Sequence, residues 1–132
     1  MNKIGPKSVR TAAPSKGKIL YCEIDAKVLS EQSRMFERAG YTVETTVGRG
    51  GAVQSLLKNH YDLVVLGHTL TKDDRHHLAY MAKKSSEATQ VLVLHASGKH
   101  PAVDFAMDSR QGEKAIITAL DSLSQTRATM AS

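Results

Sequence analysis

Apolar residues along the chain fall into two patterns that alternate. Short, nearly continuous apolar runs at 18–23 (KILYCE), 61–67 (YDLVVLG) and 89–95 (TQVLVLH) predict strands that are buried on both faces. The segment 41–46 (YTVETT) alternates as a half-buried strand does, and 102–107 (AVDFAM) predicts a fifth strand.

Between these runs the apolar residues recur at helical spacing. The spacing predicts four helices, over about residues 26–39, 51–59, 72–85 and 111–124. Asp25 is placed to cap the first helix, and Gly40 to end it. Thr71 or Asp73 can cap the third helix. The glycine-rich segment 48–51 (GRGG) lacks the lysine of a phosphate-binding loop, so it predicts a tight turn into the second helix.

The alternation of strands and helices predicts an α/β fold in three layers. Consecutive strands joined through helices lie parallel, with right-handed crossovers and helices on both faces of a doubly wound sheet. The segment ASGKHP joins the fourth and fifth predicted strands and is too short for a helix, so that helix is expected to be shortened or missing. Such sheets place their pocket outside the carboxyl ends of the strands.

Charge and composition divide the 132-residue chain into three parts. Residues 1–17 are predicted to be a disordered basic tail, 18–124 the folded domain, and 125–132 a flexible tail. Five of the 18 basic residues lie at or before Lys18 and account for the net charge of +5. The rest of the chain has 13 basic and 13 acidic residues and is therefore formally neutral. Nucleic-acid binding beyond weak contacts of the basic tail is therefore not expected. No apolar run is long enough for a membrane span, and the lone Cys22 fits a reducing cytoplasm.

Three segments carry a resemblance to a known family: KILYCEID, FERAGYTVETTVGRGGAVQSLLKNHYDLVVLGHTL and TQVLVLHAS. Together they resemble the receiver domain of bacterial response regulators, over about residues 18–124. The resemblance implies a flavodoxin-like sheet of five parallel strands in the order 2-1-3-4-5. It also implies a role in phosphorelay signalling as a stand-alone receiver-like domain.

The receiver family brings four kinds of group together at the carboxyl edge of its sheet. An acidic pair after the first strand helps to hold Mg²⁺, and an aspartate ending the third strand accepts the phosphoryl group. A Ser or Thr after the fourth strand and a Lys after the fifth steady the phosphoryl oxygens. Phosphoryl transfer depends on such positioning and on neutralising charge.

Measured against the family pattern, the chain lacks the acceptor. Glu23 stands at the first acidic position, Ile24 stands at the second, and Asp25 follows one place later. Gly67 stands where the phosphoryl-accepting aspartate is expected, and glycine has no side chain to phosphorylate. The resemblance therefore implies a degenerate pocket in which no acyl phosphate forms at residue 67.

Two further departures alter the chemistry of the same pocket. His95 stands where Ser or Thr is expected, and Asp108 replaces the phosphate-binding lysine. With His68, which follows Gly67, these residues suggest an alternative: a small-ligand or metal sensor around Glu23, His68, His95 and Asp108. Glu23, His68 and His95 are reasonable zinc ligands. The favoured prediction remains a polar pocket without metal or cofactor.

The sequence predicts a module that acts by binding a protein rather than by catalysis. No nucleophile–base pair is visible, so an enzyme is not expected. The shortened connection before the fifth strand leaves surface uncovered, which favours a protein partner or a homodimer. The sequence does not specify whether that partner is a kinase or an output protein. His76 and His77 are neighbours in the third helix and are expected at its surface.

Overall fold

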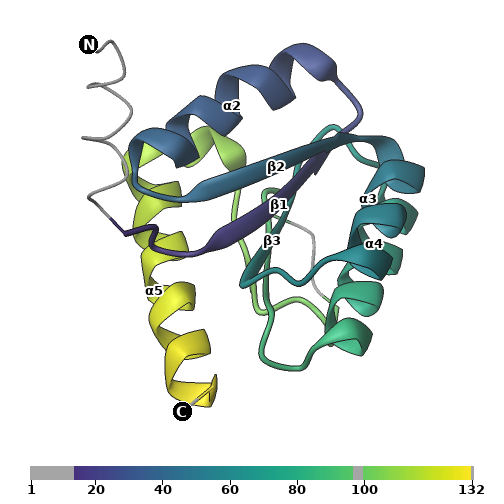
Figure 1. Ribbon diagram of the computed structural model, residues 1–132. Helices are drawn as coiled ribbons and strands as arrows, with labels where there is room; N and C mark the ends of the chain where they lie inside the picture. The colour runs from purple at the N-terminus through teal and green to yellow at the C-terminus, as the bar shows by residue number, and fades with distance from the viewer. Residues whose placement is uncertain (1–13, 97–99, 132) are drawn as a thin grey trace, which may run out of the picture.

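The computed structural model describes residues 14–96 and 100–131. It contains a five-stranded, all-parallel sheet in the order β2-β1-β3-β4-β5, as expected (Figure 1). The strands are β1 (Lys18–Glu23), β2 (Thr42–Val47), β3 (Leu63–Leu66), β4 (Gln90–Val93) and β5 (Phe105–Ala106). Because all strands run the same way, their carboxyl ends meet at one edge of the sheet.

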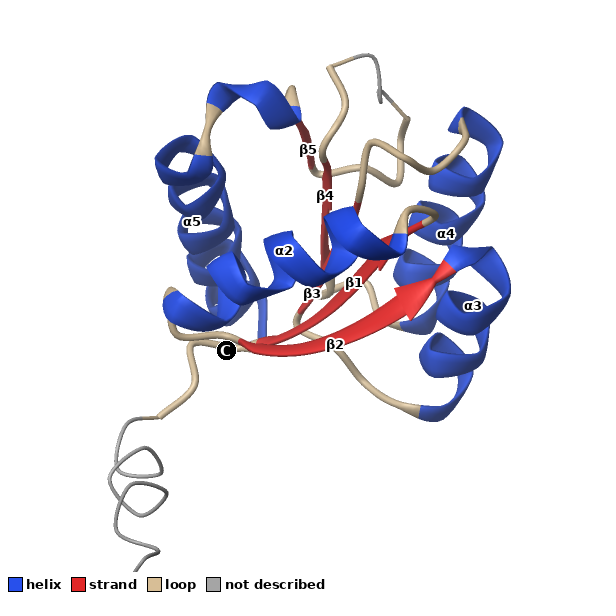
Figure 2. Cartoon of the chain, turned by 90° about the horizontal axis from the view of Figure 1, so that it is seen from above, coloured by secondary structure: helices blue, strands red, loops and turns tan. Residues whose placement is uncertain are grey.

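Helices cover both faces of the sheet and form the outer layers. They are α2 (Ala26–Arg38), α3 (Gly48–Lys58), α4 (Lys72–Ser85) and α5 (Glu113–Ala131), with a short 3₁₀ turn η1 (Ser109–Gln111). Helices α2 and α5 lie on one face, and α3 and α4 lie on the other (Figure 2). The predicted three-layer architecture is confirmed.

Strand β1 shows how the sequence builds two separate apolar cores. Ile19 and Tyr21 point into the cluster under α2 and α5, whereas Leu20 and Cys22 point into the cluster under α3 and α4. All four side chains are fully buried. Burying a side chain such as Leu or Ile contributes about 1.5–3 kcal/mol, which is why the continuous apolar run marks a central strand.

The predicted helix ends agree with the structure in three places. The Asp25 carboxylate accepts hydrogen bonds from the backbone N–H groups of Lys27 (2.9 Å) and Val28 (3.0 Å) and so caps α2. The Thr71 hydroxyl accepts one from the N–H of Asp74 (3.1 Å) and caps α4. Gly40 follows α2 with φ of +107°, a conformation that glycine adopts without strain.

Three predicted boundaries were wrong. Helix α5 continues to Ala131 instead of ending near residue 124, because no Gly or Pro interrupts it and Arg127 pairs with Asp62 at 2.9 Å. Helix α3 begins at Gly48, so the glycine-rich segment forms its first turn. Strand β5 has only two residues, because the segment just before it turns: the N–H of Val103 donates to the carbonyl of His100 (2.9 Å).

The connection between β4 and β5 contains no helix among its described residues, 94–96 and 100–104. The expected loss of a helix here is therefore supported where the chain is described. Residues 1–13, which hold most of the predicted basic tail, lie outside the described residues. In the part of the chain that is described, no helix is long and apolar enough to cross a membrane.

Candidate functional site at the carboxyl ends of the strands

Glu23 is the last residue of β1, and its fully buried carboxylate accepts three hydrogen bonds. It accepts from the hydroxyl of Tyr21, from the backbone N–H of Thr69 (3.0 Å) and from the hydroxyl of Thr69 (2.6 Å). Burial, together with the negative charge of Glu23, raises the pKa of Tyr21 well above its usual range. The tyrosine therefore stays protonated and keeps donating to the carboxylate.

Gly67 follows β3 directly, and the Glu23 carboxylate fills the space above it. A β-carbon at residue 67 would lie 1.8 Å from Cδ of Glu23 and 1.9–2.0 Å from its two oxygens. The φ of Gly67 is not positive, so backbone conformation does not explain the glycine. Close approach explains it: a side chain fits at residue 67 only if Glu23 moves away.

Thr69 ties the loop after β3 to the loop after β1. Its hydroxyl oxygen accepts hydrogen bonds from the backbone N–H groups of Ile24 (2.8 Å) and Asp25 (3.2 Å) while the hydroxyl donates to Glu23. The Ile24 side chain is 47% exposed, and the Asp25 carboxylate caps α2. Ile24 has no carboxylate and the Asp25 carboxylate is engaged at the start of α2, so neither residue forms an acidic pair with Glu23.

Arg75 of α4 is a buried cation beside this network and was not noticed in the sequence. Its side chain is almost fully buried, and its guanidinium donates to the backbone carbonyl of Leu70. Burial lowers the pKa of Arg75, and the nearby negative charge of Glu23 opposes that shift. Tyr21 and Thr69 were missed as well, because nothing local in the sequence links them to Glu23.

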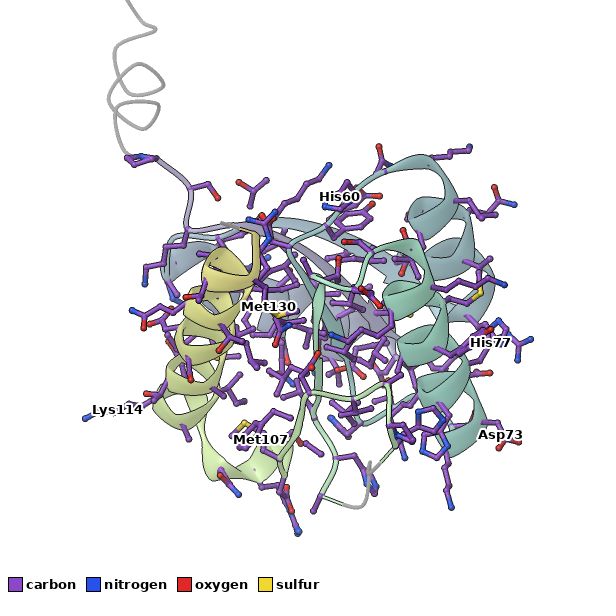
Figure 3. All side chains as sticks on the ribbon, turned by 90° about the horizontal axis from the view of Figure 1, so that it is seen from below. His60, Asp73, His77, Met107, Lys114 and Met130 are labelled. Carbon is purple, nitrogen blue, oxygen red and sulfur yellow. The ribbon has the colours of Figure 1, made fainter. Side chains whose placement is uncertain are left out.

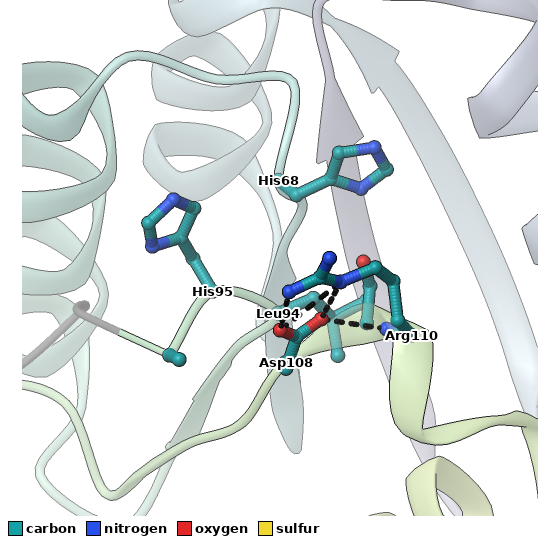
Figure 4. Close-up of a pocket in the computed structure, with 7 residues that line it drawn as sticks. His68, Leu94, His95, Asp108 and Arg110 are labelled. Atoms are coloured by element: carbon teal, nitrogen blue, oxygen red, sulfur yellow. Dashed lines mark hydrogen bonds and ion pairs between the residues drawn. The ribbon is translucent and has the colours of Figure 1, made fainter.

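A hollow of about 390 Å³ is lined by three of the four residues predicted for a ligand or metal sensor, whereas Ile24, Asp25 and Gly67 of the predicted degenerate pocket do not line it. Its lining consists of His68, Leu94, His95, Ala96, Asp108, Ser109 and Arg110 (Figure 4). His68 and His95 follow β3 and β4, and Asp108 follows β5. Glu23 is not part of the lining, because it is enclosed between Tyr21 and Thr69.

The Asp108 carboxylate forms an ion pair with Arg110, a residue that was not predicted to belong to the pocket. The Arg110 guanidinium donates to both Asp108 oxygens, at 2.7 Å from Nη2 to Oδ2 and 3.0 Å from Nε to Oδ1 (Figure 4). The backbone N–H of Arg110 also donates to Oδ1 (2.8 Å). These bonds hold the pKa of Asp108 well below its usual range.

The metal alternative is not supported by the arrangement of these residues. Glu23, His68 and His95 do not form a cluster that could hold a metal ion, and no group of three or more His, Cys, Asp or Glu residues does so among the described residues. The physical reason is that the Glu23 carboxylate turns toward Thr69 and Tyr21 instead of the two imidazoles.

Comparison with known proteins gives a uniform result for the fold. No protein-family model and no curated protein matches the sequence. A CheY-like response regulator receiver domain protein from Methanospirillum hungatei JF-1 matches with a TM-score of 0.76 and 13% identity, over 89% of this chain and 99% of that one. The signal receiver domain of an HD domain-containing protein from Pseudomonas fluorescens Pf-5 matches with a TM-score of 0.73 and 15% identity, over 89% and 98%.

A third similar structure is a response regulator protein, TrrA from Thermotoga maritima, in complex with Mg²⁺ and BeF. It has a TM-score of 0.70 and 15% identity, over 80% of this chain and 97% of that one. The matches span nearly the whole described domain. The protein is thus a flavodoxin-like α/β domain built on a five-stranded parallel sheet. More narrowly, it has the fold of CheY-like response-regulator receiver domains, as the sequence resemblance implied.

Proposed function

We propose that this protein is a receiver-like signalling module that works without phosphorylation, by binding a protein partner in the cytoplasm. The observation that carries the proposal is the position of Glu23. Its carboxylate fills the space above Gly67, where the side chain of a phosphoryl acceptor would have to lie. The cytoplasmic placement rests on the single cysteine, Cys22, which is buried and free.

The chemistry of the site supports a loss of phosphoryl transfer. Forming an acyl phosphate at residue 67 needs a carboxylate there, and Gly67 has none. Mg²⁺ in proteins is usually bound through one or two carboxylates while it keeps several of its waters. The Glu23 oxygens instead accept hydrogen bonds from Tyr21 and Thr69 in a fully buried place. Glu23, the residue at the first acidic position of the receiver pattern, therefore stabilises the fold instead of binding a metal ion.

The same contacts support a surface with one fixed arrangement. Thr69 joins the loops after β1 and β3 through hydrogen bonds to Ile24, Asp25 and Glu23. A hydrogen bond to a charged group contributes about 1.5–3 kcal/mol, so separating the loops is costly. We infer that the partner recognises this constant arrangement, with no phosphoryl group to alter it.

The open edge of the sheet supports a protein partner, a second copy of the chain included. Among the strands that the structure describes, β5 pairs only with β4, and Phe105 at that edge is 47% exposed. A hollow of about 320 Å³ between β5 and α5 is lined by Phe105, Met107 and Leu123, among others. Exposed apolar edges of this kind favour association.

Two measurements test the proposal. After incubation with acetyl phosphate and Mg²⁺, intact mass should show no added phosphoryl group, while a phosphorylatable receiver treated in parallel gains one. A stable adduct on this protein would overturn the proposed loss of phosphorylation. Light scattering over a range of concentrations, for the wild type and Phe105→Ser, tests the homodimer; a monomer at every concentration rules it out and leaves a different protein as the partner.

A second candidate function is small-ligand binding in the hollow near Arg110, because the imidazoles of His68 and His95 and the guanidinium of Arg110 line it together with the carboxylate of Asp108. Three basic groups around one carboxylate favour an anion. Titration with inorganic phosphate and with acetate, followed by amide NMR shifts, tests this candidate. Shifts confined to the hollow that disappear in His95→Ala support it, and their absence with both probes rejects it.

A further inference from the structure

His76 of α4 and His100 of the β4–β5 connection lie with their imidazole rings against each other. The ring centroids are 4.6 Å apart, with 33° between the ring planes. The expectation that His76 is a plain surface residue was therefore wrong: the residue is half-buried, and its buried Nε2 has no hydrogen-bond partner among residues 14–96 and 100–131. The contact joins segments 24 residues apart in sequence and attaches the connection to α4.

His100 also shapes the turn that it begins. Its Nδ1 accepts a hydrogen bond from the backbone N–H of Ala102 (3.1 Å), and its carbonyl accepts one from the N–H of Val103 (2.9 Å). A ring nitrogen accepts a hydrogen bond only when it carries no proton. The observed turn therefore requires an imidazole that is unprotonated at Nδ1.

The surroundings of His76 disfavour its positive charge. Burial lowers the pKa of His76, and the neighbouring His100, Lys72 and Arg75 lower it further, while Asp73 acts in the opposite direction. Two imidazolium rings at this separation would also repel each other. The packed arrangement is thus the one in which both rings are neutral.

The turn covers apolar surface at the open side of the sheet. Ala102 and Val103 pack against the apolar cluster that contains Leu78 of α4 and Val91 of β4. Just beyond the turn, Asp104 is tied to α4 by an ion pair with Lys83 at 2.7 Å. If the histidine contact opens, this ion pair still anchors the chain at Asp104, beyond the turn.

We propose that His76 and His100 form a proton-sensitive contact that holds residues 100–103 against α4 at neutral pH and releases them in mild acid. A proton on His100 Nδ1 removes the acceptor for the Ala102 N–H, and a proton on His76 places a charge in a buried position. The release exposes the apolar side chains of Ala102 and Val103 beside the edge strand β5. This regulation goes beyond the proposed function and does not depend on it.

The direction of the pH dependence follows from the lowered pKa of His76 in the closed state. The open state binds the proton more readily, so the contact is complete above the ordinary histidine pKa, about 6.5, and is lost as the pH falls below it. For each unit by which the pKa of His76 is lower in the closed state than in the open state, the ratio of open to closed protein in acid rises by about tenfold.

Amide hydrogen exchange of Ala102 and Val103, measured by NMR between pH 7.5 and pH 5, tests the proposal directly. After correction for intrinsic exchange, protection of these two amides should fall as the pH is lowered from 7.5 to 5. Their chemical shifts should change at the pH at which the His76 and His100 rings titrate. Constant protection, or an amide change at a pH unrelated to the rings, would overturn the proposal. This measurement uses the wild-type protein alone.

Variants then assign the effect to the two rings. His100→Asn keeps an oxygen that can accept from the Ala102 N–H but binds no proton, so the acid response should be smaller than in the wild type. His76→Gln should likewise reduce the response, and the double variant should abolish it. His77→Gln is the matched control, because His77 lies on the outer side of α4 (Figure 3) and should leave the response unchanged. A full acid response in the double variant, or one that disappears in His77→Gln, contradicts the assignment.

Discussion

Replacing Gly67 by alanine tests the central feature of the site. The added methyl carbon would lie 1.8 Å from Cδ of Glu23, far inside van der Waals contact. Glu23 has to leave its position, and it then loses the three hydrogen bonds from Tyr21 and Thr69. Each such bond to a charged group contributes about 1.5–3 kcal/mol, and the displaced carboxylate regains part of this by reaching water.

We therefore expect Gly67→Ala to lower the free energy of unfolding by about 3–5 kcal/mol, a large part of the 5–15 kcal/mol typical of a domain. For a domain of this size the melting temperature should fall by about 12–20 °C. Urea unfolding followed by circular dichroism measures the first quantity, and calorimetry measures the second. Gly50→Ala is the matched control: nothing lies within 4 Å of its added carbon, and Gly50 is in a helix, so it should be neutral or stabilising.

The double variant Glu23→Ala/Gly67→Ala separates overlap from any general intolerance of residue 67. Removing Glu23 clears the space, so the double variant should be about as stable as Glu23→Ala alone. The loss of unfolding free energy in the double variant is then smaller than the sum of the losses in the two single variants, by about the whole cost of Gly67→Ala. Additive effects, or a Gly67→Ala variant as stable as Gly50→Ala, would refute the reasoning.

Three further predictions concern single contacts. Thr69→Val should lower the free energy of unfolding by about 1–3 kcal/mol, because the N–H groups of Ile24 and Asp25 lose their acceptor and Oε1 of Glu23 loses one of its two hydrogen bonds, while Thr69→Ser should retain most of the stability in urea unfolding. The lowered pKa of Asp108 in the folded state means that its contribution is present above the ordinary aspartate pKa, about 3.9, and is lost as the pH falls below it; Asp108→Asn should therefore flatten the acid limb of a stability–pH curve. Removal of residues 125–132 should cost about 1–2 kcal/mol through loss of the ion pair between Arg127 and Asp62, and a truncation without effect in urea unfolding would contradict the structural role of the last turns of α5.

The sequence by itself determined which segments are strands and helices, although not all of their ends, and its resemblance to receiver domains implied the order of the strands. Strand β3 and helix α4 could be recognised because apolar periodicity reports locally which faces of a segment are buried. The caps at Asp25 and Thr71 followed from the same local logic, since a capping side chain bonds to a backbone N–H only two or three residues away. That residue 67 is a glycine and not an aspartate can be read directly from the sequence.

Only the tertiary structure decided what the altered positions do. Glu23 and Gly67 are 44 residues apart, and parallel pairing of β1 with β3 is what brings the carboxylate over the glycine. The pairing of His76 with His100 likewise depends on how the β4–β5 connection packs on α4. Periodicity along one segment carries no information on which atoms of another segment will fill a given space. The resemblance to receiver domains therefore implied a missing acceptor at residue 67, and the structure shows that the space over Gly67 is occupied by a buried, fully hydrogen-bonded glutamate.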